Sequence, residues 1–153
     1  MNIIRLRSFI DANLFLTPLF LSLAVSAEGK SINKDQVNVR AQPSLTSPIL
    51  FTAPLGYPIE IKEKKGDWFF LRDWQENDGW VHKSLVSDKN TAVILIEKAN
   101  IRNDSTQKSR VTSTANQGEV YIILEKKRKW TKLGYFDTNE PVGWIRNDLI
   151  FGE

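Results

Sequence analysis

The residue types that most often carry enzymatic chemistry are few and scattered in this sequence. His82 is the only histidine, there is no cysteine, and no serine lies in a recognisable nucleophile turn. The carboxylates clustered before Gly79, Asp73, Glu76 and Asp78, are typical of a solvated loop rather than of a catalytic pair. One histidine with dispersed carboxylates is also a poor metal site. The sequence therefore predicts a protein that is not an enzyme and needs no metal or other cofactor.

Aromatic residues offer binding chemistry instead, and all five tryptophans lie beyond residue 65. Side chains alternate along a strand, so Trp68 and Phe70 point away from the face that carries Leu71. Flat rings with polar tips suit an extended peptide, which loses little entropy on docking. We predict that such a ligand binds the aromatic-rich first half, in a groove lined by Tyr57, Trp68, Trp74, Trp80 and His82. The alternative is that loops cover these rings, or that they form a contact between domains.

Two polar pairs, Asn38 with Arg40 and Asn100 with Arg102, could together recognise a carboxylate. The favoured interpretation is structural. A short amide readily satisfies loop backbone groups, and an arginine stem covers an apolar edge. Recurrence of the pair in both halves favours this interpretation, because architecture must repeat whereas a binding site need not.

The charge balance excludes some classes of partner. Without Arg5, Arg7 and Asp11, the 21 basic and 18 acidic residues become 19 and 17, a net charge of +2. This balance argues against nucleic-acid binding, which usually concentrates positive charge on one face. The basic run at residues 126–129 is interpreted as a solvated hairpin tip. Contact with anionic surface polymers or lipid head groups is the less favoured alternative.

An internal repeat organises the chain. The correspondence pairs residues 37–40 with 99–102, Gly56 with Gly118, Trp68 with Trp130 and, after a two-residue insertion, 79–81 with 143–145 and Leu85 with Leu149. The first pairs share an offset of 62 residues and the last ones an offset of 64. Two copies of this size predict two small domains rather than a solenoid. We place them at residues 31–88 and 91–153, and expect them to touch because their joint is short and lacks glycine and proline.

Within each copy the pattern is that of strands. Residues 58–63 and 120–125 alternate apolar and polar side chains, and residues 64–67 form a polar turn with a glycine. A single 3₁₀ turn is expected at residues 83–85 and again at 147–149. No window places apolar residues at helical spacing, so the sequence predicts an all-β fold.

The first 27 residues have the order of a secretory signal: Arg5 and Arg7, an apolar run at residues 14–25, then small residues at 25–27. The run is shorter than the roughly 20 residues that span a bilayer, and it contains Pro18, so cleavage is favoured over retention as an anchor. No later segment is apolar for long enough to span a membrane. We therefore expect a periplasmic or secreted protein.

The order of several short motifs resembles the bacterial Src homology 3 (SH3) family. These are the strand at 38–40, the Pro-Ser loop at 42–44, Gly56, Trp68, and Gly79-Trp80-Val81 ahead of Leu85. The set occurs twice, and residues 67–93 are similar to the variety that occurs in pairs in exported proteins of Gram-negative bacteria. The resemblance implies tandem barrels of five or six strands with a binding role, often beside cell-wall hydrolases. Gln42, where a glycine is common, and residues 104–106 depart from the family pattern.

These observations together predict two tandem SH3-like β-barrels that act as a non-catalytic binding module. The expected ligand is an extended peptide or a peptidoglycan component. The alternative is a structural or assembly protein whose barrels contact other proteins of the envelope. Neither alternative involves a nucleic acid or, once the signal is cleaved, a membrane span.

Overall fold

The computed structural model describes residues 28–152, so the export signal expected at residues 1–27 lies outside the described part. The first half contains β1 (Glu28–Ile32), β2 (Val37–Arg40), β3 (Ile49–Ala53), β4 (Pro58–Lys65), β5 (Trp68–Arg72), β6 (Asp78–His82), the 3₁₀ turn η1 (Lys83–Leu85) and β7 (Val86–Ser87). The second half contains β8 (Thr91–Ile94), β9 (Lys98–Arg102), β10 (Val111–Asn116), β11 (Val120–Lys127), β12 (Trp130–Gly134), β13 (Pro141–Arg146), η2 (Asn147–Leu149) and β14 (Ile150–Phe151). No α-helix occurs between residues 28 and 152, and no helix there is long and apolar enough to cross a membrane.

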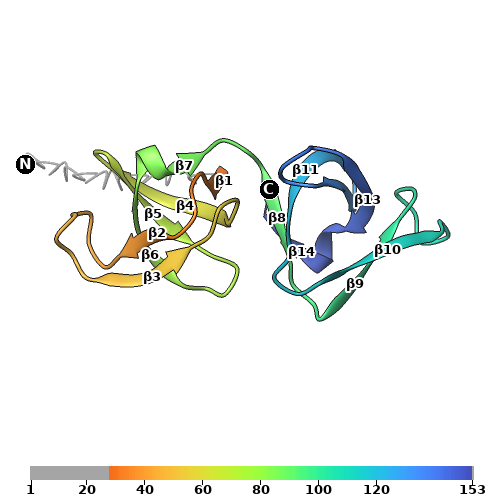
Figure 1. The fold of residues 1–153 in the computed structure, drawn as a ribbon, viewed down its shortest axis with the longest axis horizontal. Coiled ribbons are helices and arrows are strands. Elements are labelled where there is room, and N and C mark those ends of the chain that lie inside the picture. The colour runs from red at the N-terminus through yellow and green to blue at the C-terminus, as the bar shows by residue number, and fades with distance from the viewer. Residues whose placement is uncertain (1–27, 153) are drawn as a thin grey trace, which may run out of the picture.

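The strands form two separate antiparallel sheets with the same order. The first runs β3-β2-β6-β5-β4-β1-β7, and the second repeats this order as β10-β9-β13-β12-β11-β8-β14. Each sheet curls into its own barrel, with the β7–β8 connection between them (Figure 1). The prediction of an all-β fold with two barrels is therefore confirmed, as are both 3₁₀ turns. Each sheet has seven strands rather than five or six, because the two-residue strands β7 and β14 add to the edges, beside β1 and β8.

The irregularities of the two sheets also correspond. The β4–β5 pairing shifts register between Ile61 and Glu63, and the β11–β12 pairing shifts between Ile123 and Glu125. A bulge bends its strand and increases the local twist, which helps a short sheet to curl. The two bulges are 62 residues apart, which is the offset of the repeat. The bend therefore belongs to the repeated scaffold.

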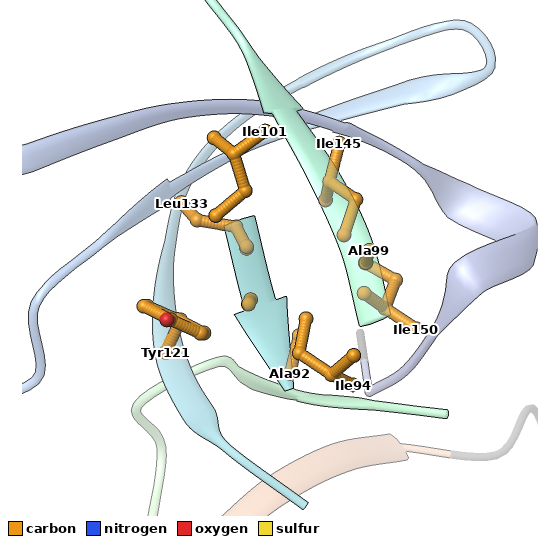
Figure 2. Packing of buried hydrophobic residues seen from close by; sticks show 9 residues of the cluster. Ala92, Ile94, Ala99, Ile101, Tyr121, Leu133, Ile145 and Ile150 are labelled. Atoms are coloured by element: carbon orange, nitrogen blue, oxygen red, sulfur yellow. The ribbon is translucent and has the colours of Figure 1, made fainter. Parts of the chain in front are cut away.

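Each barrel encloses its own apolar core. The buried side chains of the first barrel are Ile32, Val37, Val39, Ala53, Ile59, Ile61, Leu71 and Val81. Those of the second are Ala92, Ile94, Ala99, Ile101, Ala115, Tyr121, Leu133, Ile145 and Ile150, and Figure 2 shows them converging from several strands. Leu71 and Leu133 are both fully buried and occupy corresponding places. The predicted inward face of β5 and of its counterpart is thus confirmed.

The barrels contact one another at their joint. Thr91 Oγ1 donates a hydrogen bond to the Gly56 carbonyl at 2.7 Å, and Ser31 Oγ donates to the Lys89 carbonyl at 2.8 Å. Gly56 has φ +75° and lies against the Phe136 ring, which would stand 2.9 Å from an added Cβ. A side chain at Gly56 would therefore meet both backbone strain and the second barrel. These contacts agree with the expectation that the domains touch.

Candidate ligand-binding grooves

A groove of about 290 Å³ crosses the first barrel where β2, the loop before β3, β5, β6 and η1 meet. Its lining includes Asn38, Arg40, Leu45, Trp68, His82 and Leu85. We call it the first groove. Trp68 is half-buried, whereas Leu45 is 74% exposed, so the groove presents apolar surface to a ligand.

His82 and Trp68 form one wall of the first groove. They are partners across β5 and β6, and their rings meet edge to face with centroids 5.4 Å apart. The backbone N–H of Ser84 donates to His82 Nδ1 at 3.3 Å. Nδ1 also lies 2.8 Å from Ser84 Oγ, a contact in which the donor depends on the ring tautomer. Packing and these contacts together fix the ring, and Nε2 remains available for a hydrogen bond to a ligand.

Arg40 shapes the opposite wall. Its Nη1 donates to the Ser47 carbonyl at 2.7 Å and so ties β2 to the loop that carries Leu45. Ser47 Oγ in turn accepts the Gln42 backbone N–H at 2.8 Å. These bonds support the structural interpretation of this arginine. The Asn38 side chain makes no hydrogen bond among residues 28–152, so its predicted role in satisfying loop backbone groups is not observed.

The second barrel carries a groove of about 200 Å³ at the corresponding place, which we call the second groove. Its lining includes Asn100, Arg102, Gln107, Trp130, Arg146 and Leu149. Arg102 Nη1 donates to the Ser109 carbonyl at 2.7 Å, the same bond that Arg40 makes. The two grooves thus share Asn, Arg, Trp and Leu. They differ at Leu45 and His82, which are replaced by Gln107 and Arg146.

Comparison with known proteins identifies the scaffold. Residues 33–88 match the family described as bacterial SH3 domain. The first barrel is a bacterial SH3 domain. The second barrel has the same strand order, the same bulge and a corresponding groove.

One curated relative extends over both barrels. The chain is 23% identical over 146 residues to "Putative N-acetylmuramoyl-L-alanine amidase YrvJ" of Bacillus subtilis (strain 168). The match covers 88% of this chain but only 28% of the relative, so the chain spans less than a third of that protein's length.

Two solved structures resemble the chain at low identity. NlpC2 from Trichomonas vaginalis is 14% identical, with 84% of this chain and 49% of that chain covered and a TM-score of 0.35. An NlpC/P60 family protein from Bacillus cereus is 11% identical, with 82% and 56% covered and a TM-score of 0.36.

The five aromatic residues predicted to line one groove occupy three places on the bacterial SH3 domain. Trp68 and His82 lie in the first groove. Trp80 is only 9% exposed and packs against Phe70, with ring centroids 5.2 Å apart. Trp80 therefore reinforces the sheet and offers little surface to a ligand.

Tyr57 and Trp74 form a third place, at the Arg72 end of β5 rather than the Trp68 end. The Tyr57 hydroxyl donates to Asp73 Oδ2 at 2.9 Å, and Asp73 also accepts the backbone N–H groups of Gln75 and Asn77. Burial raises the pKa of the Tyr57 hydroxyl, and the bond to Asp73 raises it further. The Trp74 indole N–H is near enough to lower that pKa slightly, yet it is buried without a hydrogen bond in the described part. These residues hold the loop after β5 in place.

The lining residues of the first groove that sequence reasoning missed include Leu45, Leu85 and residues 34–37. The repeat itself pointed to Asn38 and Leu85, because both recur in the second copy at the expected offsets. Nothing in the local sequence distinguishes Leu45 from a solvated loop residue. Within residues 28–152, no cluster of histidine and carboxylate side chains could hold a metal ion.

Proposed function

We propose that this protein is an exported, non-catalytic cell-wall-binding module of two domains, at residues 31–88 and 91–153. The first groove would bind an extended peptide of the peptidoglycan type. One observation carries the proposal. The half-buried Trp68 ring stands beside Asn38, whose amide has no hydrogen-bond partner within the described residues, in a groove with an apolar rim.

This arrangement matches the chemistry of a short peptide. The Asn38 amide offers a donor and an acceptor, which is what one peptide unit needs in return. The Trp68 ring and Leu85 offer flat apolar surface to small side chains such as those of alanine. His82 Nε2 can form a hydrogen bond with a polar group of the peptide. Arg40 and His82 are both held by neighbouring groups, so little side-chain entropy is lost on binding.

The comparisons support the cell-wall setting. The family is that of bacterial SH3 domains, and the Bacillus subtilis relative is named for cleavage of the bond between N-acetylmuramic acid and L-alanine. That relative is more than three times longer than the match, so its amidase activity does not carry over to this chain. Binding is the part of its action that two barrels could share.

The direct test is a titration of the purified protein with a muramyl pentapeptide, followed by nuclear magnetic resonance of indole and amide signals. We expect shifts at Trp68, His82 and Asn38. The Trp68→Ala variant should lose about tenfold or more in affinity, because truncating a central aromatic anchor costs upward of 1–2 kcal/mol. Tyr135→Ala is the matched control, since this ring is 53% exposed and lies outside both grooves.

Two results would count against the proposal. One is unchanged affinity in Trp68→Ala when its amide spectrum still indicates a folded barrel. The other is absence of binding to both the muramyl pentapeptide and intact peptidoglycan sacculi in a pull-down.

A second candidate function, assembly with an envelope protein, is favoured by one specific surface. Leu45, Ile49 and Leu50 are 74%, 51% and 53% exposed, and β3 is the edge strand of the first sheet. Exposed apolar edge strands readily pair with another chain. If assembly is the function, Ile49→Ser with Leu50→Ser should abolish capture of a periplasmic partner. The same change should leave peptide binding at Trp68 intact.

A further inference from the structure

The second groove continues into an adjoining hollow of about 550 Å³, and the two share Gln107, Trp130 and Arg146. The half-buried Trp130 thus lies between two connected hollows. This combined surface, which we call the Trp130 surface, is larger than the first groove.

The lining of the Trp130 surface is strongly cationic. It contains five basic side chains, namely Lys98, Arg102, Arg128, Lys129 and Arg146, and one acidic side chain, that of Asp148. The Arg146 guanidinium donates two hydrogen bonds to the Asp148 carboxylate, one to each oxygen. Arg102 uses one N–H to hold the Ser109 carbonyl. Lys98, Arg128 and Lys129 form no ion pair within residues 28–152, so the surface keeps an excess of positive charge.

The turn that carries Arg128 and Lys129 requires a left-handed backbone at Arg128, a conformation that favours glycine. Arg128 has φ +53°, and the corresponding residue of the first barrel is Gly66 with φ +58°. Glycine adopts this conformation at little cost, whereas an arginine there carries strain of order 1 kcal/mol. The next residue changes in the same direction, from Asp67 to Lys129. The second copy thus places two cations where the first has none.

Asn147 holds this turn beside Trp130. Its Nδ2 donates to the Arg128 carbonyl at 2.9 Å, and its backbone N–H donates to the Lys129 carbonyl at 2.9 Å. In the first barrel the position of Lys129 is taken by Asp67, whose carboxylate pairs with Lys83. This ion pair lowers the pKa of Asp67. The same scaffold therefore presents a fixed cationic turn in one barrel and a neutralised turn in the other.

We propose that the Trp130 surface is a second binding site, specific for an anionic glycan. A sugar ring would stack its C–H face on the exposed part of the indole. Carboxylate or phosphate groups on neighbouring units would pair with Arg128, Lys129 and the remaining N–H groups of Arg102. A flat lipid surface fits less well, because the indole lies within a hollow rather than at a protruding tip. The site goes beyond the peptide function of the first groove and does not depend on it.

The test is calorimetric titration of the full protein with an oligogalacturonate of seven to eight units, with the methyl-esterified oligomer as a neutral counterpart. The charged oligomer should bind and the neutral one should bind at least about tenfold more weakly, with the difference shrinking as salt rises. R128Q with K129Q, and separately W130A, should each reduce affinity about tenfold.

The matched control is K62Q with K65Q, which also removes two positive charges, at exposed positions of the first barrel that line neither groove nor the Trp130 surface. This variant should retain affinity within about twofold, because distant surface charges are screened. Equal loss in the control, unchanged affinity in a folded W130A, or competition by phosphatidylglycerol vesicles would each overturn the proposal. Trp68→Ala should leave oligogalacturonate binding intact, so failure of the first groove and failure of this site are distinguishable.

Discussion

Arg40 in the first barrel and Arg102 in the second make the same hydrogen bond at the same distance, whereas the groove positions across from them differ. His82 corresponds to Arg146, and Leu45 corresponds to Gln107. The shared residues tie strands to loops and fill cores. The differing residues reach into the grooves, and His82 additionally accepts the Ser84 backbone N–H.

This contrast separates what builds a barrel from what a barrel binds. A residue that satisfies a backbone carbonyl must recur if the loop is to keep its shape. A residue at the rim is free to change at little cost to the fold, because its side chain contacts water rather than the core. The duplicated scaffold therefore supports two surfaces of different charge, one largely apolar and one cationic.

The largest effects should come from the two cores. Leu71→Ala and Leu133→Ala each remove a fully buried side chain at corresponding places, and each should lower the free energy of unfolding by about 2–5 kcal/mol. Because each sheet encloses its own core, Leu71→Ala should accelerate amide hydrogen exchange mainly in residues 28–87. Leu133→Ala should act mainly on residues 91–151. Equal acceleration in both ranges would mean that the barrels unfold as one unit.

A smaller and unequal pair of effects should come from two glycines that correspond in the repeat. A Cβ at Gly143 would lie 2.6 Å from the Arg102 carbonyl oxygen, and its φ of +143° disfavours any side chain. A Cβ at Gly79 would meet chiefly the Val39 side chain, at 2.4 Å, which can shift more readily than backbone. We expect Gly143→Ala to cost about 3 kcal/mol and Gly79→Ala about 1–2 kcal/mol, measured by chemical denaturation. A larger cost at Gly79 would contradict this assignment of the strain.

Much of the scaffold could be predicted from the repeat and the strand alternation. The offset of 62 residues related Leu71 to Leu133 and Trp68 to Trp130, and alternation placed the leucines inward and the tryptophans outward. Both 3₁₀ turns followed from short polar segments after a Gly-Trp strand. These features depend on local pattern, which a sequence carries directly.

The grouping of the aromatic residues could not be predicted in the same way. Alternation assigned Trp80 and His82 to one face of β6, but it did not show that Phe70 would cover Trp80. Tyr57 and Trp68 lie near opposite ends of the β4–β5 pair, a separation that depends on sheet register. The contribution of Leu45 depends on how Arg40 folds the loop back, which is a tertiary contact. The left-handed turn at Arg128 has no local signal except the glycine in the other copy.

The smallest effects should come from two tyrosines, one in each barrel, whose hydroxyls donate to different carboxylates. Tyr57 donates to Asp73 in the first barrel, and Tyr121 donates to Glu119 in the second at 2.7 Å. Tyr57→Phe and Tyr121→Phe should each cost about 1 kcal/mol at neutral pH, since each removes one hydrogen bond to a carboxylate.

The pH dependence of these two bonds follows from the direction of the pKa shifts. Burial, reinforced by the neighbouring carboxylate, raises the pKa of both hydroxyls above the value of about 10 in an unfolded chain. Their contribution to stability is therefore complete below about pH 10 and is lost as the pH rises through the folded-state values. Absorbance at 295 nm should show late ionisation of Tyr57 and Tyr121, and each Phe variant should remove one late component. Early ionisation of Tyr57 alone would mean that the loop carrying Asp73 opens in solution while Tyr121 stays shielded.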